Sequence, residues 1–335
     1  MTSLKDFCFR LPKVELHAHL NGSISPATMK ELVERKKETK PKLSEFKIPE
    51  NLDADSFFPL FGFIYELTDD EESVKIATRN IIDEFARDNV RYLELRTTPR
   101  SNAETGMTKT SYLEAVTSVI QEPRKDITVR LIVSADRRNT LEEAEEVIDL
   151  AVAFRSKGVV GIDLCGDVKQ GSFENLKPAF DRAKFLEFPV TLHFNEVIEN
   201  LPEGPAMLAF RPNRLGHATI LDEYCRKTIY ENHVPIEICM TSNVLCKTAK
   251  SYEQHHIKEL IDHGHPFVLS TDDKGVFFSD LSNEYRIAGE TFNLTISELF
   301  NTSYHAIDAI FGGDKIKAEL QNIWLAFKQK CIEEF

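Results

Sequence analysis

The sequence predicts an α/β protein with one domain, a (β/α)8 TIM barrel that takes up residues 1–335. Three observations lead to this prediction. Short apolar segments typical of strands alternate eight times with longer segments of helical periodicity. Repeated strand–helix units form a parallel sheet with right-handed crossovers, and eight of them close a barrel. Polar residues follow nearly every predicted strand, and no change in composition marks a domain boundary.

The first strand is expected over residues 13–20, where apolar side chains alternate with Glu15, His17 and His19. This period of two places both imidazoles on one face of the strand. A doubly wound open sheet is the alternative, but it usually has a GxGxxG turn here, and the residues 21–23 are Asn-Gly-Ser. The other strands are expected over residues 90–96, 128–135, 159–164, 190–194, 214–217, 235–240 and 267–271.

Helices are expected between the strands, and an extra helical segment is inserted after the first strand. Ser25 is a favourable N-cap before Pro26, which suits the first helical turn. A charged loop with two prolines is expected over residues 38–49. The inserted segment, residues 55–67, is apolar on most sides, so it either packs in the core or covers an active site. The helices are expected over residues 26–37, 55–67, 69–88, 110–121, 141–157, 173–185, 220–232, 251–263, 281–292, 297–311 and 315–330, with a short one near residue 206.

The composition excludes several classes of protein. With 41 basic and 54 acidic residues the net charge is −13, which argues against non-specific binding to nucleic acids or anionic membranes. No segment approaches the length that spans a membrane, and we expect no signal peptide. The six cysteines are scattered and form no CxxC pair. We therefore expect reduced, mostly buried thiols in a cytoplasmic protein that is a monomer.

Histidine and carboxylate side chains follow several of the predicted strands. The carboxyl ends of barrel strands meet at one face, which carries the active site. His17, His19, His193 and Asp272 are therefore expected to converge. Imidazole and carboxylate ligands with one position left for water are typical of a catalytic Zn²⁺ site. We expect one Zn²⁺ per chain, with Fe²⁺ or Co²⁺ as alternatives.

Three more residues at the strand ends are candidates for acid–base chemistry. Because a Zn²⁺-bound water ionises near neutral pH, His217 is expected to take its proton and Asp273 to orient the attacking oxygen. Glu196 is expected to protonate the atom that gains electron density. Each residue alone has a plainer interpretation, such as a core histidine or a helix cap. Their convergence at one barrel face favours a catalytic site.

Six ordered motifs make the chain resemble the adenosine/AMP deaminase branch of the metal-dependent amidohydrolases, from residue 11 to about residue 325. They are PKVELHAHL (12–20), GIDLCGD (161–167), HFNE (193–196), RLGH (214–217), TSN (241–243) and STDD (270–273). The resemblance implies hydrolytic deamination at C6 of a purine, with Glu196 donating a proton to N1. It also implies that the backbone N–H of Gly166 meets purine N3 and that Asp136 binds the ribose hydroxyls.

Within this branch the chain is most similar to the group that converts N6-methyl-AMP and related N6-substituted nucleotides to IMP. The segments LNGS (20–23), YLELRTTPR (92–100), ADRR (135–138) and TDDKGVF (271–277) carry this similarity. Deaminases of free adenosine usually have Asp where this chain has Asn21. A carboxylate there would repel a 5′-phosphate, and a charge pair a few Å apart near a surface is worth several kcal/mol. The sequence therefore favours a purine nucleotide as the small-molecule partner.

The resemblance also implies a set of substrate-binding residues. Thr97, Thr98 and Arg100 would supply donors to the phosphate. Tyr65 stands where the group more often has His, and a tyrosine cannot carry a positive charge. The apolar segment 55–67 would shape a recess for the N6-methyl group. The whole expected set is His19, Asn21, Tyr65, Thr97, Thr98, Pro99, Arg100, Asp136, Gly166 and Asp273.

Two other functions are consistent with parts of this pattern. One is an adenosine deaminase that acts on free nucleosides, and Asn21 and Arg100 argue against it. The other is a barrel that binds purines without catalysis, and the intact set of Glu196, His217 and Asp273 argues against that. A deaminase of nucleic-acid bases is the least favoured alternative, because the H-x-E…P-C-x-x-C signature is absent and the net charge is negative.

Overall fold

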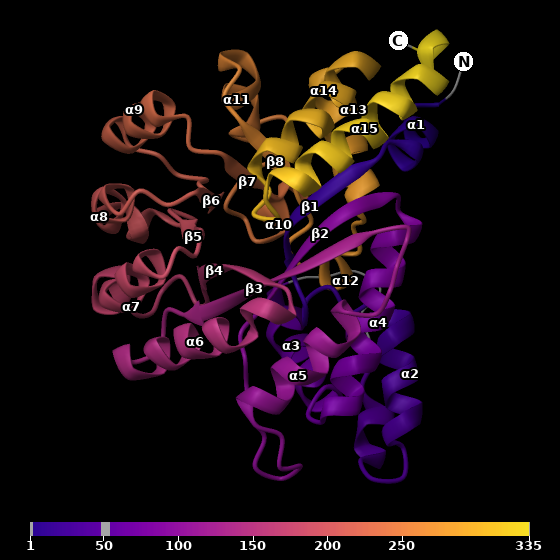
Figure 1. Cartoon of the computed structure of the whole chain (residues 1–335), viewed down its shortest axis with the longest axis vertical. Helices are drawn as coiled ribbons and strands as arrows, with labels where there is room; N and C mark the ends of the chain where they lie inside the picture. The colour runs from indigo at the N-terminus through magenta and orange to yellow at the C-terminus, as the bar shows by residue number, and fades with distance from the viewer. Residues whose placement is uncertain (1–2, 48–53, 335) are drawn as a thin grey trace.

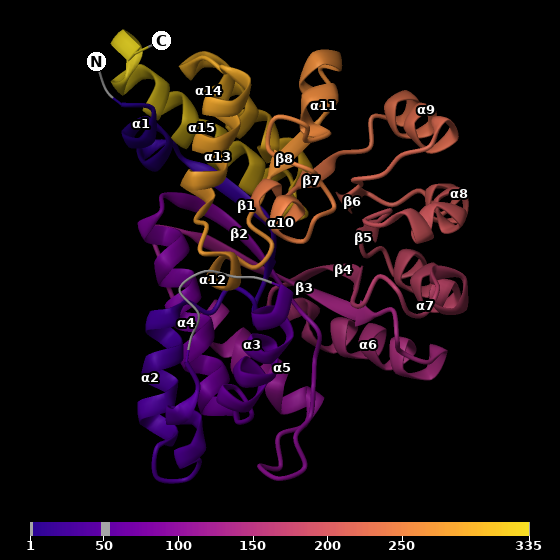
Figure 2. The same cartoon turned by 180° about the vertical axis from the view of Figure 1, so that it is seen from behind.

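The computed structural model describes residues 3–47 and 54–334, and within them it has the predicted fold. Eight parallel strands form one sheet in the order β1-β2-β3-β4-β5-β6-β7-β8, and helices surround it (Figure 1; Figure 2). The strands are β1 (Lys13–His19), β2 (Val90–Thr97), β3 (Thr128–Asp136), β4 (Val159–Cys165), β5 (Val190–Phe194), β6 (Arg214–His217), β7 (Ile236–Ile238) and β8 (Phe267–Leu269).

The helices cover the outside of this barrel, and the two chain ends lie side by side near α1 and α15 in both views (Figure 1; Figure 2). The α-helices are α1 (Leu4–Arg10), α2 (Pro26–Lys36), α3 (Ala54–Leu67), α4 (Glu71–Arg87), α5 (Lys109–Ile120), α6 (Leu141–Phe154), α7 (Phe173–Phe185), α8 (Gly204–Ala209), α9 (Glu223–Asn232), α10 (Met240–Leu245), α11 (Ile257–His263), α12 (Lys274–Phe277), α13 (Leu281–Phe292), α14 (Ile296–His305) and α15 (Asp314–Lys330). The short 3-10 helices are η1 (Pro41–Glu45), η2 (Arg155–Lys157), η3 (Ile198–Glu203), η4 (Ala306–Ala309) and η5 (Ile332–Glu334).

The barrel closes between β8 and β1 through a few contacts just past the end of β8. Ala18 pairs with Asp272 in a parallel bridge. The N–H of His19 donates to the carbonyl of Asp272 at 2.9 Å, and the N–H of Asp272 donates to the carbonyl of His17 at 2.7 Å. This seam places two expected ligand-bearing segments in direct backbone contact.

The strict alternation expected for the first strand is interrupted by a β-bulge. Glu15 pairs with Leu93 and Ala18 pairs with Leu95, so Leu16 and His17 lie opposite a single residue of β2. The N–H of His17 is instead accepted by the side chain of Glu15 at 2.7 Å. Alternation of polarity in the sequence contains no signal for such an extra residue.

Several element boundaries differ from the sequence prediction, each for a local reason. Helix α1 has no counterpart among the predicted helices, because seven residues show too little periodicity, yet Ser3 caps it and Phe7 and Cys8 are buried. Strand β7 is shorter than expected because α10 begins at Met240, where the sequence predicts strand, and β8 ends at Leu269. Helix α11 starts later than expected, and its N-terminal segment is fixed by the N–H of Ile257 donating to the His255 ring.

Two further expectations, the cap of the second helix and the state of the cysteines, are confirmed. Ser25 caps α2, accepting the N–H of Thr28 at 3.2 Å. The six cysteines are all free thiols, and five of them are buried. The expected loop over 38–49 contains η1, whereas residues 48–53 and the side chains of residues 54–58 lie outside the described part. Among the described residues, no helix has the length and apolar character needed to cross a membrane.

Candidate active site

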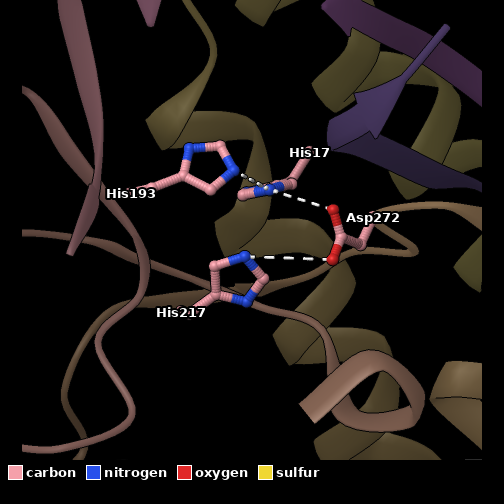
Figure 3. Close-up of side chains that lie close together, drawn as sticks. All are labelled: His17, His193, His217 and Asp272. Atoms are coloured by element: carbon pink, nitrogen blue, oxygen red, sulfur yellow. Dashed lines mark hydrogen bonds and ion pairs between the residues drawn. The ribbon is translucent and has the colours of Figure 1, made fainter. Parts of the chain in front are cut away.

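Side chains from the ends of β1, β5, β6 and β8 meet inside one end of the barrel. The ligand atoms of His17, His193, His217 and Asp272 all lie within 4.8 Å of one another. Figure 3 shows these four side chains pointing toward one another. His19 joins them, with its Nε2 atom 3.2 Å from Nε2 of His193 and 3.4 Å from Oδ1 of Asp272. The structure thus brings all four residues expected to bind metal together, and adds His217.

The spacing of these atoms suits a tetrahedral metal ion. Zn–N bonds of 2.0–2.1 Å at tetrahedral angles put two ligand atoms about 3.3 Å apart. Nε2 of His17 lies 3.1 Å from Nε2 of His193 and 3.4 Å from Oδ1 of Asp272. The geometry therefore fits a small cation coordinated by His17, His19, His193 and Asp272.

Buried carboxylates behind two of the histidines support the same assignment. Glu237 lies 2.6 Å from Nδ1 of His17, and Asp163 lies 3.1 Å from Nδ1 of His193. Each carboxylate accepts the hydrogen on Nδ1 of its histidine, so Nε2 of that ring carries a lone pair. The Nε2 lone pairs of His17 and His193 therefore face each other. Two lone pairs that face each other at 3.1 Å repel unless a cation lies between them.

A layer of buried charge in the barrel holds these carboxylates in place. Arg96 contacts both of them, at 2.8 Å from Glu237 and 3.3 Å from Asp163. Arg214 contacts Glu237 at 2.6 Å and Glu94 at 2.7 Å. Burial opposes ionisation, but Arg96 and Arg214 hold the pKa of Glu237 well below its usual range. The side chains of Arg96, Arg214, Glu94 and Glu237 are inaccessible to solvent. Because water does not stabilise these charges, the arginines and the carboxylates must compensate one another.

Glu196 and His217 lie next to the ligand cluster. Nε2 of His217 is 3.7 Å from Oε2 of Glu196 and 3.9 Å from Oδ2 of Asp272. Burial raises the pKa of Glu196, whereas burial lowers the pKa of His217 well below its usual value. A carboxyl group with a raised pKa beside an imidazole with a lowered pKa is an arrangement suited to acid–base chemistry.

Asp273 is buried against the loop that follows β1. A Cβ atom on Gly22 would lie 1.7 Å from Oδ1 of Asp273, so only glycine allows this approach. The loop is fixed to α12, because the N–H groups of Gly275 and Val276 donate to the carbonyl of Gly22 at 2.9 and 3.0 Å. Burial and the adjacent Asp272 raise the pKa of Asp273.

The residues expected to meet the base and ribose are adjacent to one another. A Cβ on Gly166 would lie 2.5 Å from Oδ1 of Asp136, and the φ angle of Gly166 is 110°. Asp136 is already paired with Arg138, which donates to its two carboxylate oxygens at 2.8 and 2.6 Å. A ribose at this position would compete with Arg138 for Asp136.

The residues expected to bind phosphate have protein partners of their own. The Thr97 hydroxyl is 2.6 Å from the Tyr112 hydroxyl, and the Thr98 hydroxyl is 3.5 Å from Sγ of Cys165. Arg100 donates to the carbonyl oxygens of Tyr65 and Thr68 at the end of α3. Its guanidinium lies 4.9 Å from the centroid of the Tyr65 ring.

Asn21 lies two residues past the end of the bulged strand β1. Its Oδ1 atom is buried and has no hydrogen-bond partner among the described residues. Pro99 is buried between Thr98 and Arg100 and supplies no side-chain donor. Tyr65 is 45% exposed, which leaves its ring accessible at the mouth of the barrel.

Sequence reasoning missed Glu94, Arg96 and Glu237, which support the site from behind. It noted Asp163, Ser242 and Asn243 only as members of motifs and gave them no role. Charged residues inside strands that are otherwise apolar were the available signal, as in the segments 92–96 and 236–239. Charges at alternate positions of a buried strand indicate an interior polar layer of the barrel.

This fold and this cluster define a barrel hydrolase of the metal-dependent amidohydrolase type. The family model described as "Adenosine deaminase" matches residues 12–323. The chain therefore belongs to the adenosine deaminase family, whose members are metal-dependent hydrolytic deaminases.

Individual relatives show the same relationship over nearly the whole chain. The N6-Methyl-AMP deaminase of Danio rerio is 41% identical, covering 98% of this chain and 98% of the relative. The apo structure of the N6-methyl-AMP deaminase from Arabidopsis thaliana superposes with a TM-score of 0.92 at 39% identity, covering 97% of this chain and 99% of the other. An Arabidopsis ADAL structure complexed with IMP has a TM-score of 0.90 at 39% identity and covers the same 97% and 99%.

Proposed function

We propose that this chain is a zinc-dependent hydrolase that converts N6-methyl-AMP and water to IMP and methylamine, and that residues 1–335 form one domain. The observation that carries the proposal is the convergence of His17, His19, His193 and Asp272 beside Glu196 and Asp273. Relatives with 38–41% identity that carry the name N6-methyl-AMP deaminase support the choice of substrate. A structural neighbour in complex with IMP supports a nucleotide product.

In this proposal one Zn²⁺ is held by His17, His19, His193 and Asp272. A zinc ion in such a site makes water nucleophilic near neutral pH. Glu237 and Asp163 fix the rings of His17 and His193, and Ser242 donates to Oδ2 of Asp272 at 2.7 Å. The protein thus keeps the ligand atoms in place before the substrate arrives.

The purine would be held by Gly166 at N3 and by Asp273, and the ribose by Asp136. Asn21, Tyr65, Thr97, Thr98, Pro99 and Arg100 would surround the 5′-phosphate, with His19 contacting the substrate as well. The uncharged amide of Asn21 does not repel the 5′-phosphate, whereas a carboxylate at this position would.

The proposed reaction forms a bond between the water oxygen and C6 and breaks the bond between C6 and the methylamino nitrogen. Glu196 gives its proton to N1, which makes C6 more electrophilic, and later recovers a proton from the new C6 hydroxyl group. The proton released by the attacking water passes to one of the two groups on that side, His217 or Asp273, and then to the departing nitrogen. The product is IMP with a hydrogen on N1, and atoms and charge balance.

Incubation of the purified, metal-analysed protein with N6-methyl-AMP tests the proposal. We expect IMP and methylamine in equal amounts and about one zinc per chain. Glu196→Gln is expected to keep the zinc and to lose turnover by about 10²-fold or more, because it removes the proton donor to N1. Absence of IMP from the wild-type protein would overturn the proposed reaction.

One observation favours a second candidate, hydrolysis of free adenosine. Nη1 and Nη2 of Arg100 donate to the end of α3, so fewer of its donors are free to bind a phosphate than the sequence suggests. A comparison of nucleoside and nucleotide substrates separates the two functions.

A further inference from the structure

His217 differs from the other two buried histidines of the site in what lies behind its ring. Nδ1 of His17 and of His193 each face a carboxylate, whereas Nδ1 of His217 faces the side-chain amide of Asn243 at 3.2 Å. Figure 3 shows one nitrogen of the His217 ring directed at Asp272. Which nitrogen carries the hydrogen follows from the orientation of the Asn243 amide.

A chain of hydrogen bonds fixes that amide. The backbone N–H of Ile257 donates to Nδ1 of His255 at 3.1 Å, so the hydrogen of the neutral His255 ring is on Nε2. Burial lowers the pKa of His255 to about 2, which keeps the ring neutral. Nε2 of His255 therefore donates to Oδ1 of Asn243, 3.0 Å away.

A second contact is compatible with this orientation. The hydroxyl of Thr248 lies 3.2 Å from the backbone carbonyl of Asn243, to which it donates, and it accepts from the amide nitrogen Nδ2 of Asn243, also at 3.2 Å. The contact with His255 therefore places Nδ2 of Asn243, a donor, against Nδ1 of His217. Asn243 is 2% exposed and His255 is 1% exposed, so water does not compete for these bonds.

We call the hydrogen-bonded series Ile257–His255–Asn243–His217 the relay. From this relay we infer that Asn243 and His255 are positioning residues that fix His217 in the tautomer with its hydrogen on Nε2. In that tautomer His217 donates a hydrogen bond to the attacking oxygen. It is neither a fourth imidazole ligand of the metal nor the acceptor of the water proton. The identity of that oxygen rests on the proposed function. The tautomer of His217 does not depend on the proposed function.

The relay also explains why His217 is a poor proton acceptor in this site. Protonation at both nitrogens would turn Nδ1 into a donor that faces the donor Nδ2 of Asn243. The proton of the attacking water then passes to Asp273, the other group on that side, and from there to the departing amine. This differs from the role in proton removal that the sequence suggested for His217.

Nitrogen NMR of the zinc-loaded protein labelled with ¹⁵N-histidine tests the tautomer directly. His217 signals are assigned by their loss in His217→Gln and by proximity to the Asn243 amide protons. We expect the hydrogen of His217 on Nε2, and those of His17 and His193 on Nδ1. A hydrogen on Nδ1 of His217 would overturn the inference, even if the protein hydrolyses N6-methyl-AMP. If the tautomer is as inferred but N6-methyl-AMP is not hydrolysed, only the proposed function fails.

A variant pair tests whether the relay matters for turnover. Asn243→Asp replaces the donor by an acceptor, so the His217 hydrogen is expected to move to Nδ1 and kcat to fall by about 10- to 100-fold with little change in KM. The matched control is Asn200→Asp, because Asn200 is a buried asparagine whose amide donates to the carbonyl of Val168 at 2.8 Å instead of to a histidine. An unchanged tautomer in Asn243→Asp, or an equal loss of kcat in the control, contradicts the inference.

Discussion

The side chain of Glu15 joins the first strand of the barrel to Thr271, two residues past the end of the last strand. The carboxylate of Glu15 accepts the N–H of Thr271 at 3.0 Å and its hydroxyl at 2.8 Å, and its other oxygen accepts the N–H of His17 at 2.7 Å. Thr271 directly precedes Asp272 in the chain. One buried carboxylate therefore holds the backbone on both sides of the seam that carries His17 and Asp272, two of the proposed metal ligands.

We predict that Glu15→Gln weakens metal binding. An amide has one oxygen and one NH2 group, so it must turn a donor toward the N–H of either His17 or Thr271. Supporting residues around metal sites are typically worth about 10- to 100-fold in affinity, and we expect a loss in that range. Competition with a chelator, monitored by zinc release, measures it.

Asp88→Asn is the matched control for this prediction. Asp88 is a buried carboxylate that accepts the N–H of Ser282 at 2.9 Å and its hydroxyl, far along the chain from the ligands. The control is expected to lower the free energy of unfolding and to leave zinc affinity unchanged. Equal zinc affinities of Glu15→Gln and the wild type would show that the seam does not position the ligands.

We predict that Gly22→Ala disables the site without unfolding the barrel. The added Cβ would overlap Oδ1 of Asp273 at 1.7 Å, so Asp273 or the loop must move. A displacement of about 1 Å in a catalytic group costs about 10²-fold in rate, and we expect kcat to fall at least that far. Gly62→Ala is the control, because nothing lies within 4 Å of its added Cβ in α3. Wild-type kcat in Gly22→Ala would rule out the role assigned to Asp273.

We predict that Asn21→Asp changes the preference between nucleotide and nucleoside. A carboxylate at this position would repel the 5′-phosphate, and a partly exposed charge pair is worth at least about 1.4 kcal/mol, or tenfold. The ratio of kcat/KM for N6-methyl-AMP to that for N6-methyladenosine is expected to fall by at least this factor. Both kcat/KM values are measured on the same variant, so a general loss of activity lowers both and does not change their ratio. An unchanged ratio would place the phosphate elsewhere.

We predict that Lys13 makes stability rise with pH in the alkaline range. Burial lowers the pKa of Lys13 from 10.5 to about 8, although its Nζ atom donates to the carbonyls of Cys8 and Leu11. Between these pH values the unfolded chain binds more protons than the folded one, so the contribution of Lys13 to stability grows as pH rises through this window and is smallest below about pH 8. The full shift corresponds to about 3 kcal/mol.

Urea unfolding of the wild type and of Lys13→Met measures this contribution. The difference in free energy of unfolding between wild type and variant is expected to grow in favour of the wild type between about pH 8 and pH 10. Other groups titrate equally in both proteins and cancel in the difference. A difference that stays constant or shrinks would contradict the prediction.

The barrel was predictable because its signals are local and repeated. Parallel strands buried on both faces leave apolar runs such as 159–164, and the helices between them keep a period near 3.6 residues. The ends of those strands are also local features, so the sequence alone places His17, His193 and Asp272 on one face of the barrel. The count of strands then determines the architecture.

The supporting network was not predictable in the same way, because it depends on which side chains face each other across the barrel. Arg96 and Glu237 lie 141 positions apart in the sequence, and only closure of the barrel brings them to 2.8 Å. The bulge at Leu16 and His17, the short helix α10 and the relay through Asn243 arise from tertiary contacts as well. Arg100 also shows this limit, because its Nη1 and Nη2 atoms donate to the end of α3, a partner that its motif does not reveal.

Steady-state kinetics of the zinc-loaded protein with N6-methyl-AMP, AMP and adenosine tests the central claim most directly. The proposed site, with neutral Asn21 beside the cluster of His17, His19, His193 and Asp272, predicts the highest kcat/KM for N6-methyl-AMP. We expect a preference over adenosine of at least tenfold, equivalent to about 1.4 kcal/mol. A higher kcat/KM for adenosine than for N6-methyl-AMP would contradict the account and indicate a nucleoside deaminase.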